Sequence, residues 1–105
     1  MKSFFNIGCG HVGGFVNVMI YDWQKKFLPG EKISIRIKSQ VKLDRVAYCW
    51  NDGKETEVFS FLKKHYWFRI TMPKAEIALL TVITEGKFAG KTVVDRHEIN
   101  INGNI

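Results

Sequence analysis

The residues with the clearest potential for chemistry lie near the N-terminus, where residues 8–13 (GCGHVG) match the pattern G-x-G-x-x-G. In dinucleotide-binding proteins these glycines allow a tight turn and let the backbone approach a pyrophosphate at a helix N-terminus. Such proteins also need an acidic residue to hold the ribose, and the next expected strand, Ile33–Ile37, is followed by KSQ. No later strand–helix–strand unit follows. The pattern therefore favours a glycine-rich arm, and we expect no cofactor.

Metal-binding and catalytic side chains are sparse along the chain. Cys9 and His11 form one Cys-x-His pair, whereas a structural zinc site needs four ligands, usually as two closely spaced pairs. Cys49, His65 and His97 have no second ligand close to them in sequence. The chain also has no G-x-S-x-G motif, no H-E-x-x-H motif and no clustered carboxylate pair. We expect neither a metal site nor an enzyme.

Trp67 is the aromatic residue best placed to meet a ligand. The alternation of residues 66–72 puts it on the polar side of a strand, together with Arg69 and close to Lys63 and Lys64. An exposed tryptophan beside cations could stack on a sugar, a base or a partner side chain. The alternative is that a second sheet or a loop covers it, and the sequence supports the two equally.

Composition predicts one globular domain with a basic surface. The 105 residues are 46% hydrophobic and 25% charged, with a formal net charge of +6 and a pI near 9.5. Twelve lysines and four arginines are dispersed along the chain, which favours lysines covering the polar sides of strands over a nucleic-acid patch. No run spans a membrane and no export signal is evident, so we expect a virion or cytoplasmic protein with two free cysteines.

Short β-strands are the elements that must position these residues. Residues 28–31 (LPGE) predict a turn, after which Ile33, Ile35 and Ile37 form one buried side of a strand. Residues 41–50 are apolar on both sides, which predicts a central strand. Residues 51–53 (NDG) predict a turn, residues 54–58 an edge strand, and residues 59–64 fit a strand or one helical turn.

The second half of the chain continues the same pattern. Residues 66–72 predict a strand that ends at Pro73, residues 77–84 a central strand, and residues 85–90 a turn. Residues 91–101 close the fold, with Asp95 and His97 interrupting the apolar side at a bulge or an exposed stretch. Residues 102–105 predict a frayed tail. Residues 15–27 fit either a strand or a helix, and their β-branched residues favour the strand.

Together these segments resemble an immunoglobulin-like sandwich of the kind found in bacterial surface proteins and phage virion proteins. The resemblance covers residues 15–101 and depends on residues 29–37, 46–53, 68–73 and 79–84, which look like its second, third, fifth and sixth strands. Trp50 matches the buried tryptophan of the third strand, whereas residues 77–84 lack the cysteine of antibody-type domains. The resemblance implies an all-β antiparallel sandwich of about seven strands over residues 15–105, preceded by an arm of residues 1–14.

The resemblance implies a non-enzymatic structural or interaction protein. We expect an accessory component of a large assembly, such as a phage capsid auxiliary (decoration) protein, whose arm is anchored on a capsid protein by Phe4, Phe5 and Ile7. Two alternatives stay open. One is a glycan- or nucleic-acid-binding module that uses Lys63, Lys64, Trp67 and Arg69, with nucleic acid not favoured; the other is a small phage inhibitor of a host protein.

Overall fold

The described part of the chain folds into six β-strands. The computed structural model describes residues 16–59 and 63–105, which contain no helix and therefore none that could cross a membrane. Every strand pairing is antiparallel, as predicted for an all-β fold. The strands are β1 (Val16–Ile20), β2 (Lys32–Trp50), β3 (Thr56–Phe59), β4 (Lys63–Thr71), β5 (Ile77–Phe88) and β6 (Lys91–Asn102).

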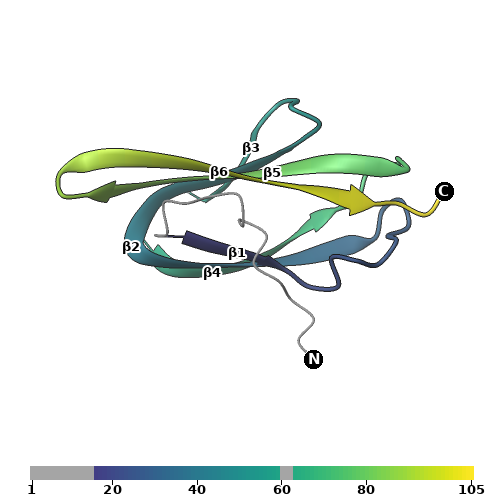
Figure 1. Cartoon of the computed structure of the whole chain (residues 1–105), viewed down its shortest axis with the longest axis horizontal. Helices are drawn as coiled ribbons and strands as arrows, with labels where there is room; N and C mark the ends of the chain where they lie inside the picture. The colour runs from purple at the N-terminus through teal and green to yellow at the C-terminus, as the bar shows by residue number, and fades with distance from the viewer. Residues whose placement is uncertain (1–15, 60–62) are drawn as a thin grey trace.

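The long strand β2 organises the sheet. Its first half pairs with β1 on one edge and β4 on the other, and its second half pairs with β5 and β3. The hairpin partner β6 extends the sheet beyond β5. Because β2 curls back, the sheet forms a half-barrel in which β1, β4 and the first half of β2 face β5, β6 and the second half of β2 (Figure 1). We call these the lower and the upper layer.

The bend in β2 corrects the prediction of two separate strands at residues 33–37 and 41–50. The register of β2 shifts between Lys38 and Leu43 against β4, so hydrogen bonding is interrupted but the chain stays extended. At the bend, the Val41 N–H donates to Ser39 Oγ at 3.1 Å. Gly86 allows the close approach of β5 there, because a Cβ at that position would lie 2.9 Å from the Lys42 carbonyl oxygen.

Alternating apolar side chains fill the space between the two layers. The predicted isoleucine side of residues 33–37 is confirmed, and residues 41–50 are central as predicted, with strands paired on both edges. β1 also confirms the strand prediction within residues 15–27. The buried residues of the interior are Val16, Val18, Ile20, Phe27, Ile33, Ile35, Ile37, Leu43, Val46, Tyr66, Ile70, Met72, Ala78, Leu80, Val82 and Ile101.

Three predicted turns occur, one of them shorter than expected. In residues 28–31 the Glu31 N–H donates to the Leu28 carbonyl at 3.0 Å, and Gly30 has a φ of 86°. Asn51 and Asp52 both have positive φ, with the Gly53 N–H bonded to the Trp50 carbonyl. The turn predicted over residues 85–90 is wrong in extent, because β5 continues to Phe88 and only residues 89–90 turn.

Two predictions for the C-terminal strand are wrong. Asp95 and His97 are 9% and 2% exposed, and the β5–β6 register runs without a shift, so there is neither a bulge nor an exposed stretch. The prediction of a frayed tail at residues 102–105 is also wrong, because backbone hydrogen bonds hold the tail in place. The Gly103 N–H donates to the Glu76 carbonyl and the Asn104 N–H to the Phe27 carbonyl, at 2.7 and 2.8 Å.

Candidate ligand-binding face

The outward side of the lower layer gathers exposed cations around an exposed tryptophan. On β2, Lys32, Arg36 and Lys38 alternate with the buried isoleucines and therefore point away from the interior. On β4, Trp67 lies directly opposite Arg36, and Arg69 directly opposite Ser34. We call the surface formed by Lys32, Arg36, Lys38, Trp67 and Arg69 the cationic face.

The net charge of the chain is concentrated in this layer. Residues 16–20, 32–40 and 63–71 contain six of the sixteen basic residues and no aspartate or glutamate. The other ten basic residues balance the ten acidic residues of the chain, so the formal charge of +6 equals the charge of these three segments. Dispersal along the sequence thus becomes segregation in the fold, because strands distant in sequence pair side by side.

No carboxylate of the described chain neutralises the cationic face. The ion pairs of the described residues join Lys25 to Glu31, Arg45 to three glutamates, and Arg96 to Asp52, all elsewhere. Lys32 Nζ donates to the neutral hydroxyl of Thr71 at 2.7 Å. An anionic partner would therefore not have to displace an internal carboxylate from these cations.

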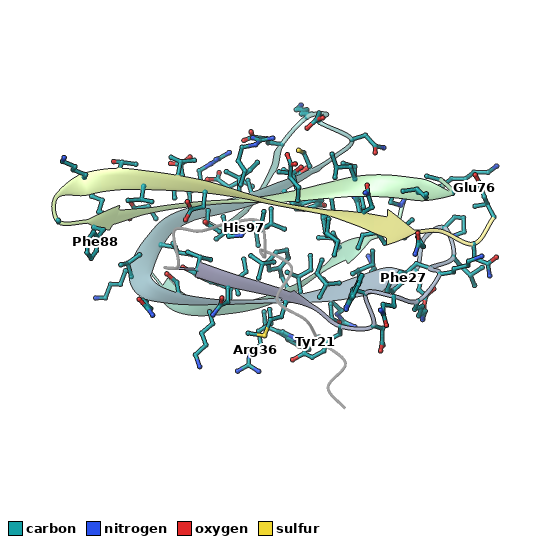
Figure 2. The ribbon with its side chains drawn as sticks, in the orientation of Figure 1. Tyr21, Phe27, Arg36, Glu76, Phe88 and His97 are labelled. Atoms are coloured by element: carbon teal, nitrogen blue, oxygen red, sulfur yellow. The ribbon has the colours of Figure 1, made fainter. Side chains whose placement is uncertain are left out.

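A shallow hollow of about 550 Å3 opens beside Trp67. Its described lining comes from Tyr21, Arg36, Tyr66 and Trp67, and the Tyr66 side chain itself is buried in the interior. Figure 2 shows Tyr21 and Arg36 side by side on the outward side of the lower layer. Tyr21 is held there by its N–H, which donates to the Ser34 carbonyl at 3.1 Å. The volume falls within the range of small-molecule binding sites.

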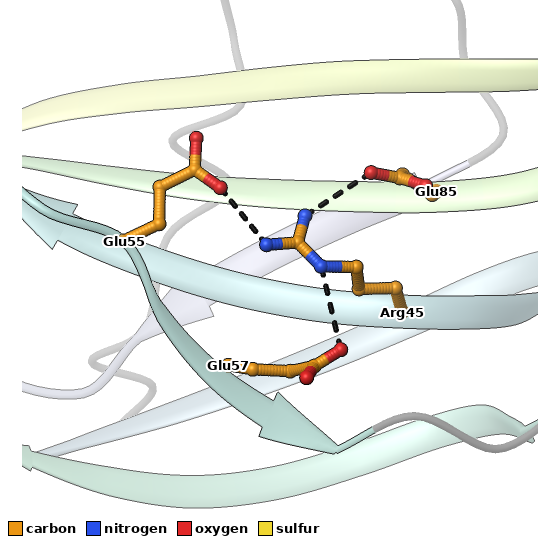
Figure 3. A network of polar contacts seen from close by, with 4 residues as sticks. All are labelled: Arg45, Glu55, Glu57 and Glu85. Atoms are coloured by element: carbon orange, nitrogen blue, oxygen red, sulfur yellow. Dashed lines mark hydrogen bonds and ion pairs between the residues drawn. The ribbon is translucent and has the colours of Figure 1, made fainter.

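The outward side of the upper layer has a different electrostatic character. Arg45 Nη2 contacts Glu55 at 2.9 Å, Nη1 contacts Glu85 at 3.1 Å, and Nε contacts Glu57 at 3.3 Å (Figure 3). The hydrogen bond with Glu55 is the largest cause that raises the pKa of the Arg45 guanidinium, followed among the raising causes by Glu85. This cluster links β2 to β5, to β3 and to Glu55 just before β3, so the charge of Arg45 is already paired, unlike the charges of the cationic face.

The structure brings together part of the predicted partner-binding set. Trp67 is 63% exposed and Arg69 is exposed, which is the geometry that ligand stacking requires, and the described chain does not cover the ring. The side chains of Lys63 and Lys64 lie outside the described residues, as do Phe4, Phe5 and Ile7 and the glycine pattern of residues 8–13. Whether these residues bind a partner stays a prediction.

Sequence reasoning missed the contribution of β2 to this face. Arg36 and Lys38 occupy solvent-facing positions of the strand whose alternation is clearest. Nothing in the sequence indicated that Trp67 would lie opposite Arg36. The available signal was the absence of any acidic residue from residues 32–40 and 63–71. If these two segments had been predicted to pair, their exclusively positive charge would have predicted a charged face.

A polar group within the interior is the other feature that could do chemistry. Thr84 lies directly opposite Asp95, and His97 follows two residues along β6 on the same inward side. Figure 2 places His97 between the layers. All three side chains are buried, and the hollow on the lower layer is lined by other residues. A substrate has no described route to this group.

The described residues contain no cluster of three or more metal-ligating side chains. Cys49 is a buried free thiol, as predicted for a small apolar group within a strand, whereas Cys9 and His11 lie outside the described residues. Comparison of the chain with protein-family models, with curated proteins and with solved structures finds no match.

Proposed function

We propose that this protein is a non-enzymatic binding module that docks an anionic partner on its cationic face. The observation that carries the proposal is the coincidence of the whole formal net charge with one layer of the sheet, around an exposed Trp67. Like charges held on neighbouring strands destabilise the free protein slightly, and an anionic partner relieves that repulsion.

The geometry suits a partner with several negative charges. Arg36, Lys38 and Arg69 are exposed, so they reach a partner without rearrangement of the backbone. Binding would release counterions from a polyanion, which makes the affinity depend steeply on salt. The charge-paired upper layer would not compete for the same partner, because Arg45 is already surrounded by Glu55, Glu57 and Glu85.

Charge reversal on matched surfaces tests the proposal. The double variant Lys38→Glu/Arg69→Glu should lose affinity for heparin, a strongly anionic polysaccharide, and its affinity should depend less on salt. The control Lys87→Glu/Lys91→Glu makes the same charge change at exposed positions of the β5–β6 hairpin. Equal losses in the two variants, or no binding of the unaltered protein even at low salt, would contradict the proposal.

An accessory role in a large assembly is a second candidate, with a capsid auxiliary protein of a phage as its specific form. The cationic face supports it, because such a protein could dock on acidic neighbours while Phe4, Phe5 and Ile7 anchor the arm. Deletion of residues 1–14 should abolish co-sedimentation with a large particle and leave the fold intact. Truncated protein that still sediments with the particle would remove the arm from the proposal.

The narrower description of the fold as an immunoglobulin-like sandwich belongs to this proposal too. Two facing antiparallel layers support it, as does Trp50, which packs against the core although it is only half-buried. Against it, the described chain has six strands, and β2 runs continuously through both layers. A solved structure that included residues 1–15 and 60–62 would decide between a sandwich and a half-barrel.

A further inference from the structure

Trp67 offers a flat aromatic surface in the middle of the cationic face. Directly opposite residues on paired strands have Cβ atoms about 5 Å apart, so Arg36 flanks the ring on β2. Arg69 lies two residues along β4 on the same side, and Lys38 two residues along β2. A planar group that stacked on Trp67 would thus be within reach of cations on several sides.

The hollow gives this stacking position a defined size. Tyr21, Arg36 and Trp67 line about 550 Å3 of space that is open to solvent, enough for one flat ring system with its attached sugar. A neutral sugar could stack there too, yet it would leave the surrounding cations without a counterpart. An acidic peptide would satisfy the cations and leave the aromatic lining unused. A ligand with alternating phosphates and aromatic bases uses both features.

A single strand fits better than a duplex. Bases in a duplex are stacked on each other, and unstacking one of them costs a few kcal/mol. The cationic face lies on a layer of three paired strands, β1, β2 and β4, which is wider than the α-helix or two-stranded ribbon that a major groove admits. Exposed bases of a single strand can stack on Trp67 without that cost, and aromatic stacking combined with a cationic track is how sequence-tolerant binders of single strands work.

We propose that the cationic face binds single-stranded nucleic acid, with one base stacked on Trp67 and neighbouring phosphates held by Arg36, Lys38 and Arg69. This inference rests on the proposed function and specifies its partner. The distance from Lys32 to Lys38 along β2 is about 20 Å at the usual rise per residue. The face therefore holds only a few nucleotides, on the order of four, at the low end of known sites.

Fluorescence anisotropy on the full chain tests the inference with four labelled probes and one unlabelled competitor. The probes are an oligothymidine, an oligouridine of the same length, a DNA duplex of the same length, and heparin as a polyanion without bases; the competitor is an oligoglutamate peptide. We expect both single strands to bind more tightly than the duplex, and the comparison of thymidine with uridine reports whether DNA or RNA is preferred.

The variants separate stacking from charge. Trp67→Ala should weaken oligothymidine binding about tenfold, which corresponds to the loss of one base–aromatic stacking interaction. The same variant should leave heparin binding unchanged, because heparin has no bases. Trp67→Phe should restore most of the loss because it keeps an aromatic ring. Phe88→Ala, which removes another exposed aromatic ring at the end of β5, is the matched control and should bind as the unaltered protein does.

Each contrary result has a distinct meaning. If heparin and oligothymidine bind equally well and Trp67→Ala weakens neither, the nucleic-acid inference is wrong and the proposed function stands. If an oligoglutamate peptide competes better than oligothymidine, the partner is an acidic protein and the inference is again wrong. If none of the anionic probes binds at low salt, the inference and the proposed function both fail.

Discussion

Arg36 on β2 lies directly opposite Trp67 on β4, and both side chains are exposed on the outward side of the lower layer. The neighbouring pair one position away, Ile35 and Phe68, points inward, where Ile35 is fully buried. Binding and stability are therefore assigned to opposite sides of the same two strands. Substitutions on the outward side can test function without unfolding the protein.

The first prediction concerns that separation. Trp67→Ala should change the free energy of unfolding by less than about 0.5 kcal/mol, because the ring is 63% exposed. Ile35→Ala should cost about 2–5 kcal/mol, because it opens a cavity in the interior. Urea unfolding of both variants measures the contrast. A large loss of stability in Trp67→Ala would mean that the ring is a structural contact and would weaken its assignment to a ligand.

The second prediction concerns the Arg45 cluster on the upper layer. Arg45→Ala should lower the free energy of unfolding by about 1 kcal/mol at low salt, because it leaves Glu55, Glu57 and Glu85 close together without a cation. The loss should shrink in about 1 M salt, where charges are screened within about 3 Å. Thermal unfolding at the two salt concentrations measures it.

Arg96→Ala is the matched control for that cluster. Arg96 contacts Asp52 at 3.8 Å and both side chains are well exposed, so its removal should have almost no effect. If Arg45→Ala proved as harmless as Arg96→Ala, the cluster in Figure 3 would contribute nothing to holding β3 against β2.

The third prediction concerns acid stability at the turn of residues 28–31. A side-chain hydrogen bond from Lys25 is the largest cause that lowers the pKa of Glu31, followed by the Leu28 N–H, which donates to Glu31 Oε1 at 2.9 Å. Because the folded-state pKa is depressed, Glu31 stabilises the fold above its ordinary pKa of about 4.3, and the contribution disappears as the pH falls through the lowered value.

Glu31→Gln removes that titration. The variant should therefore lose less stability than the unaltered protein between about pH 6 and about pH 3, as measured by urea midpoints. Lys25→Ala should reproduce part of the effect, because the Leu28 N–H still favours the charged carboxylate. Identical acid profiles for Glu31→Gln and the unaltered protein would show that the turn is not stabilised by the charged form of Glu31.

The fourth prediction concerns the C-terminal tail. A Cβ on Gly103 would lie 1.8 Å from the Ala75 carbonyl oxygen, so one of the two backbone segments must move. Gly103→Ala should cost about 1–3 kcal/mol, the usual range for overpacking. Asn104→Ala, at the exposed neighbouring position, should be close to neutral. Equal stability of the two variants would show that the tail is not packed against residues 75–76.

Much of the local structure could be predicted from the chain. The alternation of Ile33, Ile35 and Ile37 with polar residues, the turn containing Gly30, and the end of β4 before Pro73 all depend on interactions within a few residues. The exposed side of Trp67 followed from the same alternation, since successive side chains of a strand point to opposite sides. Local sterics and hydrophobic burial are sufficient for these features.

Other features depended on contacts between distant segments. The sequence suggested separate strands at residues 33–37 and 41–50, because nothing local distinguishes a loop from the bend that Ser39 and Gly86 permit. The interruption by Asp95 and His97 suggested a bulge, yet both side chains are buried in a regular ladder. The tail was expected to fray, and hydrogen bonds from its backbone to Phe27 and Glu76 hold it.

The sequence by itself determined the all-β character, the inward and outward side of most strands, and the positive charge of residues 32–40 and 63–71. Only the tertiary structure decided that β2 and β4 pair, and therefore that Arg36 lies across from Trp67. The physical reason is that the period of two is a property of each strand alone, whereas register is a property of a pair. The charged face around the Trp67 ring therefore forms only when β2 and β4 pair in this register.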